Sequence, residues 1–315
     1  MNIKQLLAGA CLALSASFAF AQDISFGIIS TDAASAQRDR WEPFFRDMEK
    51  HTGLKVKSFY ATDYAGVIEA MRFNKVQVAW YGNKAAMEAV DRANGEIFAQ
   101  LMYADGSFGY HALLITHKDS PYKTLDDVIK NGKNINFGIG DPNSTSGFLV
   151  PTYYIFSQQK LDPRQVFKTV RNGSHGANIQ AVLAKQLDVA TNNTEDMGRL
   201  QATKPELFSQ LRVLWTSPLI PSDPFVWRKD LDPAIKEKIK TFVLNYAKNN
   251  PAEKEVLKNI YNYAGFRESN NDQLKPIRQL ELFKERNKIE SAQNMSDEEK
   301  QSKLASIDKA LAELK

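Results

Sequence analysis

Short apolar runs alternate with amphipathic segments along most of the chain, and this alternation restricts the fold more than any other feature of the sequence. The first four runs are separated by segments with helical spacing, and they occupy residues 24–29, 55–60, 76–80 and 97–102. Strands that alternate with helices of roughly 10–15 residues indicate βαβ units, in which helices cover a largely parallel sheet. The sequence therefore predicts an α/β fold.

The alternation breaks at two places, which we interpret as crossings between two lobes. Near residues 103–110 the pattern stops at two glycines, and near residues 216–224 a proline-rich bend ends a second series of strands and helices. We expect the strands of this second series at residues 110–116, 135–139, 166–170 and 189–191. Two crossings form a hinge, and the cleft between such lobes commonly holds a ligand. One lobe is thus predicted over residues 22–106 and 220–270, and an inserted lobe over residues 107–219.

The two ends of the chain are predicted to lie outside these lobes. Residues 1–21 combine a short cationic start, an apolar segment and the cleavage signal Ala19-Phe20-Ala21, so we interpret them as a secretory signal peptide that is removed before Gln22. At the other end the chain is helical in pattern from Pro233 onward, and residues 271–315 form a polar tail. We expect this tail to pack on the body or on a second copy, as a homodimer, through an apolar seam of Ile277, Leu280 and Phe283.

Composition and motifs exclude several classes of function. The 315-residue chain has a formal net charge of +4 and no long basic run, which argues against nucleic acid or an anionic membrane as its main partner. Its one cysteine, Cys11, lies in the predicted signal peptide, so we expect neither disulfides nor thiolate metal sites in the mature protein. The sequence also lacks nucleophile-elbow, Walker and zinc-ligand motifs, and we expect no cofactor, no metal site and no catalytic residue.

A run of hydroxyl residues lies where a predicted strand meets a predicted helix. Ser144, Thr145 and Ser146 follow the strand at residues 135–139 and precede an apolar segment over residues 148–156. The unpaired N–H groups and the positive dipole of a first helical turn attract anions, and three hydroxyls add further donors. The alternative is that Asn143 or Ser144 is only an N-cap of the helix.

Other strand-to-helix junctions of both lobes also carry polar or aromatic residues, and in doubly wound sheets these junctions share the ligand-facing edge. His175 follows a predicted strand at the start of the next helix, where it can donate to an anion or only cap the helix. Taken singly, the remaining junction residues suit packing or capping, and their convergence on one edge favours a binding site. They are Tyr64, Trp80, Tyr81, Asn192, Glu195 and, in the second crossing, Asp223.

Long motifs at these junctions closely resemble those of the periplasmic phosphonate-binding proteins of bacterial ABC importers. The resemblance runs from about residue 26 to about residue 283, and it is carried by residues 63–66, 71–76, 79–83, 140–151, 189–195, 217–221 and 223–224. It implies a type II-like, two-lobe periplasmic binding protein, in which each lobe is a sheet flanked by helices and a helical C-terminal tail follows two hinge crossings. It also implies a phosphonate ligand captured by lobe closure, a membrane permease as partner, and a location in the periplasm.

By this resemblance, eight residues would bind 2-aminoethylphosphonate. The oxygens of the phosphonate would be held by Tyr64, Ser144, Thr145, Ser146 and His175. Glu195 and Asp223 would take the ammonium, and Tyr110 would line the cleft. A buried ammonium must be paired with opposite charge, so two carboxylates opposite an anion site select a zwitterion. One departure from the family pattern is Gly176, where the resemblance leads us to expect an acidic residue.

Two other functions are alternatives at this point. One is a binding protein for a different phosphorus oxyanion, such as phosphite, phosphate or an alkylphosphonate, although Glu195 and Asp223 would repel a ligand that carries no cation. The other is a hydrolase on the same scaffold, since a fold does not fix a function. Nothing in the sequence marks the nucleophile and base that a hydrolase of this kind needs.

Overall fold

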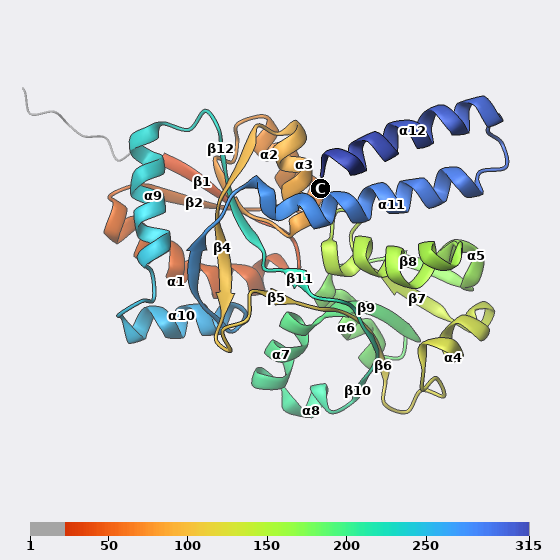
Figure 1. The fold of residues 1–315 in the computed structure, drawn as a ribbon. Coiled ribbons are helices and arrows are strands. Elements are labelled where there is room, and N and C mark those ends of the chain that lie inside the picture. The colour runs from red at the N-terminus through yellow and green to blue at the C-terminus, as the bar shows by residue number, and fades with distance from the viewer. Residues whose placement is uncertain (1–22, 315) are drawn as a thin grey trace, which may run out of the picture.

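The computed structural model describes residues 23–314, which form two α/β lobes, a connection of two short strands and a C-terminal helical hairpin (Figure 1). None of the helices within these residues combines the length and the apolarity that crossing a membrane requires. The predicted signal peptide, its cleavage site and Cys11 lie outside the described residues.

The first lobe is built on a six-stranded sheet with the order β13-β4-β12-β3-β1-β2. Its strands are β1 (Asp23–Ile28), β2 (Lys55–Tyr60), β3 (Val78–Trp80), β4 (Gly95–Tyr103), β12 (Pro224–Arg228) and β13 (Tyr263–Glu268). The helices around it are α1 (Ala34–Thr52), α2 (Tyr64–Arg72), α3 (Asn83–Arg92), α9 (Pro233–Asn245) and α10 (Pro251–Tyr261). Aromatic rings fill the core, where the centroids of Phe26, Phe44 and Phe225 lie 5.2 to 6.4 Å apart.

The second lobe is built on a five-stranded sheet with the order β10-β6-β9-β7-β8. Its strands are β6 (Ala112–His117), β7 (Asn136–Ile139), β8 (Thr169–Asn172), β9 (Val189–Asn193) and β10 (Leu211–Thr216). Its helices are α4 (Leu125–Lys130), α5 (Pro163–Val166), α6 (His175–Leu183), α7 (Thr194–Thr203) and α8 (Pro205–Phe208). Shorter helical turns are η2 (Gly132–Asn134), η3 (Thr145–Leu149), η4 (Thr152–Phe156) and η5 (Ser157–Gln159).

Both sheets share one topology. Read as β2-β1-β3-β12-β4 and β8-β7-β9-β6-β10, each has as its fourth strand the one that arrives through the hinge, antiparallel to both of its neighbours. The hinge consists of β5 (Gly109–Tyr110) and β11 (Ile220–Pro221), which pair antiparallel between the lobes (Figure 1). The expected α/β fold is confirmed, but both sheets contain antiparallel as well as parallel pairs. The sequence pattern could not predict this, because the spacing of apolar residues carries no information about strand direction.

Two segments differ from the elements that the sequence pattern predicts. The strand expected at residues 166–170 lies later in the chain than predicted: Val166 is the last residue of α5, and β8 begins only at Thr169. The region after Pro233 is helical in pattern, yet β13 lies within it and completes the first sheet along the edge of β4. The edge of β4 supplies the backbone hydrogen bonds that make this six-residue segment a strand, and that partner is distant in the chain.

The tail forms two helices, α11 (Lys275–Ser291) and α12 (Asp297–Glu313), which follow η6 (Asn271–Leu274) and fold back on one another (Figure 1). The predicted seam faces the body, because Ile277 is buried and the ring of Phe283 stacks on Tyr153 of η4 with 6.1 Å between centroids. Arg278 also forms an ion pair with Asp91 of the first lobe. Helix α11 therefore contacts both lobes, and the predicted pairing with a second copy stays a prediction.

Candidate functional site

All eight side chains that the sequence predicts to bind a ligand line one small enclosed cavity between the lobes. They come from six segments of the chain, and less than a tenth of each residue is exposed. In chain order they are Tyr64 at the start of α2, Tyr110 in β5, Ser144, Thr145 and Ser146 around the start of η3, His175 at the start of α6, Glu195 in α7 and Asp223 before β12.

The hydroxyl run forms the first turn of a helix of wide, π-type turns. Ser144 is its cap, because its Oγ accepts a hydrogen bond of 2.9 Å from the N–H of Gly147. The capping interpretation is thus correct for Ser144, and it does not exclude a second role, since the same side chain lines the cavity. Residues at the start of a helix have no intrahelical partner for their N–H groups, so Thr145 and Ser146 offer backbone donors as well as hydroxyls.

Contacts of the hydroxyl run also join the two lobes. The N–H of Lys84, at the start of α3 in the first lobe, donates to Oγ1 of Thr145 over 2.9 Å. Within the second lobe, Asn193 donates to Oγ of Ser146 over 3.3 Å. A hydroxyl that accepts a hydrogen bond keeps its own proton to donate, so both side chains can still bind an anion. The N-termini of η3 and α3, each the positive end of a helix dipole, therefore meet at the cavity.

His175 is the first residue of α6 and points at the same hydroxyls. Its Nε2 lies 3.4 Å from Oγ of Ser144 and 3.4 Å from Oγ of Ser146. Its Nδ1 is buried without a hydrogen-bond partner among the described residues. Burial lowers the pKa of His175 from its ordinary value, so the ring is neutral near pH 7 and carries one N–H donor.

The structure gives a physical reason for glycine at position 176. The N–H of Gly176 donates across the lobe interface to the carbonyl of Thr31 over 3.1 Å. A Cβ atom at this position would lie 2.3 Å from Oδ1 of Asp32, whose carboxylate pairs with Arg40 at 3.0 Å and with Arg199 of the second lobe at 3.2 Å. The acidic residue expected at position 176 would collide with Asp32. In this chain the negative charge beside position 176 comes from Asp32, in the opposite lobe.

Two carboxylates also line the cavity and are held by tyrosine hydroxyls. Glu195 Oε1 accepts hydrogen bonds from Tyr103 at 2.6 Å and Tyr263 at 2.8 Å, and Asp223 Oδ1 accepts one from Tyr110 at 3.1 Å. Burial raises the pKa of Glu195 to about 7, and burial together with the charge of Glu195 raises the pKa of Asp223 well above its usual range. Within residues 23–314 neither carboxylate forms an ion pair with a lysine or arginine. Both therefore face the cavity as carboxylates that lack a cation.

Several residues around the cavity were not predicted as site residues. Tyr103 lies at the start of the first predicted crossing and Tyr263 lies in a region of helical pattern, so no local signal identifies either one as a partner of Glu195. Asp32 follows the first strand, and this position could have suggested a role. The junction residues Trp80 and Tyr81 take different directions: Trp80 lines the cavity, whereas the hydroxyl of Tyr81 donates to the carbonyl of Val67 in the core.

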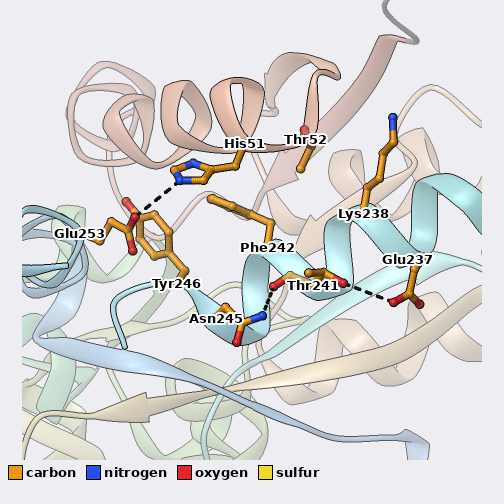
Figure 2. A pocket seen from close by; sticks show the side chains of 9 residues that line it. All are labelled: His51, Thr52, Glu237, Lys238, Thr241, Phe242, Asn245, Tyr246 and Glu253. Carbon is orange, nitrogen blue, oxygen red and sulfur yellow. Dashed lines mark hydrogen bonds and ion pairs between the residues drawn. The ribbon is translucent and has the colours of Figure 1, made fainter. Parts of the chain in front are cut away.

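A larger cavity lies within the first lobe, between α1, α9 and α10 (Figure 2). Its polar side chains pair with their neighbours: Thr241 donates to Glu237, Asn245 donates to the carbonyl of Thr241, and His51 lies 3.9 Å from Glu253 (Figure 2). None of its lining residues comes from the second lobe, so closure of the lobes would not enclose a ligand there. The cavity between the lobes is therefore the candidate site.

The chain matches proteins of one family over most of its length. Residues 26–274 match the family described as "ABC transporter, phosphonate, periplasmic substrate-binding protein". The phosphonates-binding periplasmic protein of Escherichia coli K12 is 50% identical over 291 residues, which cover 92% of this chain and 85% of that protein. A crystal structure of a binding protein component of an ABC phosphonate transporter from Pseudomonas aeruginosa has a TM-score of 0.90 and 52% identity, and the match covers 93% of this chain and 96% of that one.

A more distant structure shares the fold. The complex of PhnD1 from Prochlorococcus marinus with methylphosphonate has a TM-score of 0.72 and 21% identity, and the match covers 82% of this chain and 97% of that one.

Two α/β lobes that meet over a buried polar cavity and are joined by two hinge strands define a two-lobe periplasmic binding protein. Within this class, the chain belongs to the family of periplasmic substrate-binding proteins of phosphonate ABC transporters. It is the phosphonate-binding component of an ABC importer, whose membrane permease is its partner, and it is not an enzyme.

Proposed function

We propose that this protein captures 2-aminoethylphosphonate between its two lobes and delivers it to the permease of the importer. One observation carries the proposal: two buried carboxylates, Glu195 and Asp223, lie without a cation in the same cavity as a cluster of hydroxyl and N–H donors. This pattern of charge matches a ligand with an anionic group at one end and an ammonium at the other.

Five side chains at the donor end suit the phosphonate. Ionised oxygens accept stronger hydrogen bonds than neutral ones, and a helix N-terminus adds its dipole to each bond. Ser144, Thr145 and Ser146 would donate from the start of η3, and Tyr64 and His175, which line the same cavity, would donate beside them. Burial raises the pKa of the Tyr64 hydroxyl well above its usual range, so this group stays protonated and can donate.

The carboxylate end supports an aminated ligand rather than a simple oxyanion. A buried carboxylate without a counter-charge is disfavoured, and the raised pKa values of Glu195 and Asp223 express this cost. An ammonium between them would remove the cost and supply up to three donors. Methylphosphonate, the ligand in the PhnD1 complex, has no such group and would leave both carboxylates unpaired.

Titration calorimetry with a panel of ligands tests the proposal. The panel contains 2-aminoethylphosphonate, ethylphosphonate, methylphosphonate, phosphite and phosphate, and we expect the first to bind most tightly. At a ligand concentration 100 times the dissociation constant, the free energy of unfolding should rise by about 2.7 kcal/mol, which a thermal-shift assay measures. Tight binding of phosphate or methylphosphonate without binding of 2-aminoethylphosphonate would refute the proposed ligand.

The substitution Glu195→Gln assigns the ammonium site. Glutamine keeps the shape of the side chain and an acceptor for both tyrosines, but it removes the charge. Loss of one partner of a buried charge pair costs about 2–5 kcal/mol, so 2-aminoethylphosphonate should bind at least about 30-fold more weakly. Ethylphosphonate makes no such pair and should lose much less affinity. Equal losses for both ligands would exclude Glu195 from the ammonium site.

We also propose the lobe boundaries and the homodimer that the sequence suggests. The boundaries at 106/107 and 219/220 are supported by the positions of β5 and β11, the strands that connect the sheets.

A homodimer through the C-terminal helices is tested by sedimentation velocity of the mature protein and of a variant that ends before α12. A dimer in both proteins would place the contact outside α12, and a monomer in the full chain would refute the homodimer.

A further inference from the structure

Two neighbouring tyrosines at one corner of the first sheet bind the same carboxylate oxygen of Glu195. Tyr103 ends β4 and Tyr263 begins β13, and the antiparallel register pairs these two residues directly. Their ring centroids lie 5.5 Å apart, and both hydroxyls donate to Oε1 of Glu195, at 2.6 and 2.8 Å. Directly opposed residues on one face of a strand pair have neighbouring side chains, which explains why one carboxylate reaches both.

Both of these hydrogen bonds cross the interface between the lobes. Glu195 lies in the first turn of α7 in the second lobe, whereas β4 and β13 belong to the sheet of the first lobe. The bonds can therefore form only when the lobes are together. The other carboxylate oxygen, Oε2, receives no hydrogen bond from the described residues, and the side chain lines the cavity.

We infer that Tyr103 and Tyr263 are positioning residues that determine specificity. On closure both donate hydrogen bonds to Oε1 of Glu195, which leaves Oε2 to accept from the ammonium of the ligand. Recognition of the amine is thereby coupled to closure of the lobes. This inference rests on the proposed function, because it assigns a role within the same ammonium site.

The chemistry of the pair suits this task. The titratable groups that face Glu195 are Tyr103, Tyr263, Tyr110, Asp196 and Asp223. Burial and the charge of Asp196 favour the protonated form of Glu195, whereas the two hydroxyl donors favour its ionised form. Since only the ionised form pairs with an ammonium, the tyrosines oppose the effect of burial. Burial also keeps both hydroxyls protonated, because it raises the pKa of each tyrosine well above its usual range.

The test compares Tyr103→Phe and Tyr263→Phe with the matched control Tyr246→Phe. Tyr246 donates to Asp47 over 2.6 Å beside the cavity within the first lobe, so the control removes the same kind of bond far from the site. A hydrogen bond to a charged group is worth enough to change affinity by about 10-fold or more. We expect each site variant to bind 2-aminoethylphosphonate about 10-fold more weakly and ethylphosphonate only about 3-fold more weakly, because without an ammonium Glu195 closes in its neutral form and a hydrogen bond to a neutral carboxyl group is worth less. The control should bind both ligands as the wild type does.

A pH profile separates positioning from simple packing. Without a tyrosine donor the ionised form of Glu195 is less favoured, so the loss of 2-aminoethylphosphonate affinity on acidification should begin at higher pH in the site variants than in the wild type. Titration of the ligand itself cancels, because the same ligand is used with each protein. Equal losses for both phosphonates, or an unshifted profile, would overturn the inference.

The outcomes also distinguish this inference from the proposed function. If the wild-type protein does not prefer 2-aminoethylphosphonate to ethylphosphonate, the proposed ligand is wrong. If the wild type shows the preference and both site variants keep it unchanged, the ligand assignment survives and the role of the tyrosines is refuted. Circular dichroism checks that each variant is folded, and if Tyr263→Phe fails to fold, Tyr103→Phe at the end of β4 decides alone.

Discussion

The contact at Gly176 leads to a prediction about closure that is independent of the choice of ligand. The substitution Gly176→Ala adds a Cβ atom that would lie 2.3 Å from Oδ1 and 2.8 Å from Cγ of Asp32 in the opposite lobe. Asp32 cannot turn away without losing its ion pairs with Arg40 at 3.0 Å and Arg199 at 3.2 Å. The added methyl group therefore obstructs the closed arrangement, and it meets no such neighbour when the lobes are apart.

The size of the effect follows from the cost of overpacking. An extra methyl group in a packed contact typically costs about 1–3 kcal/mol, which corresponds to a roughly 5- to 150-fold weaker affinity. Because the cost falls on closure, the loss should be equal for 2-aminoethylphosphonate and ethylphosphonate. The melting temperature of the ligand-free protein should be unchanged or slightly higher, since alanine is about 0.5–1 kcal/mol better than glycine inside a helix.

Calorimetry with both ligands and a thermal melt of the ligand-free protein check this prediction. The matched control is Gly198→Ala in α7, where an added Cβ atom has no neighbour within 4 Å, and we expect it to bind both ligands normally. Unchanged affinity in Gly176→Ala would show that the lobes close without this contact. A fall in the melting temperature of the ligand-free protein would show that the clash acts within a folded lobe, and the reasoning would then be refuted.

Two further predictions concern the donor end and the effect of pH. Thr145→Ala leaves the buried N–H of Lys84 without its acceptor, which costs about 1–3 kcal/mol. Calorimetry should therefore show every phosphonate binding roughly 5- to 150-fold more weakly, and Thr145→Ser should restore affinity. Unchanged affinity of the Thr145→Ala protein would contradict the role of this contact. Glu195 has a pKa raised to about 7 by burial and must be ionised to pair with an ammonium, so affinity for 2-aminoethylphosphonate should fall as pH decreases through about 7. The Glu195→Gln protein, measured with the same ligand, should lack this part of the pH dependence, and an identical profile would contradict the assignment.

The positions of most elements could be predicted from the sequence because they depend on local features. Helix α2 begins after Asp63, whose side chain accepts a hydrogen bond from the N–H of Gly66, and α1 ends at Gly53 in a left-handed conformation. These signals lie within a few residues of the features they specify. Strand β13 carried no such signal, because what makes it a strand is the free edge of β4, a segment about 160 residues earlier in the chain.

The same distinction applies to the site. The sequence indicated Ser144, His175 and Glu195 because each follows a strand at the start of a helix, a position that parallel topology brings to one edge of a sheet. It did not indicate Tyr103 or Tyr263, whose importance arises only from their proximity to Glu195 in the other lobe.

By itself, then, the sequence determined the α/β class, the two crossings, the donor-rich turn at Ser144 and the family to which the chain belongs. Only the tertiary structure decided which groups oppose one another across the interface: Asp32 against Gly176, and the tyrosine pair against Glu195. The physical reason is range. Strand and helix patterns come from interactions between near neighbours in the chain, whereas the charge state of a buried carboxylate depends on every group that closure brings beside it.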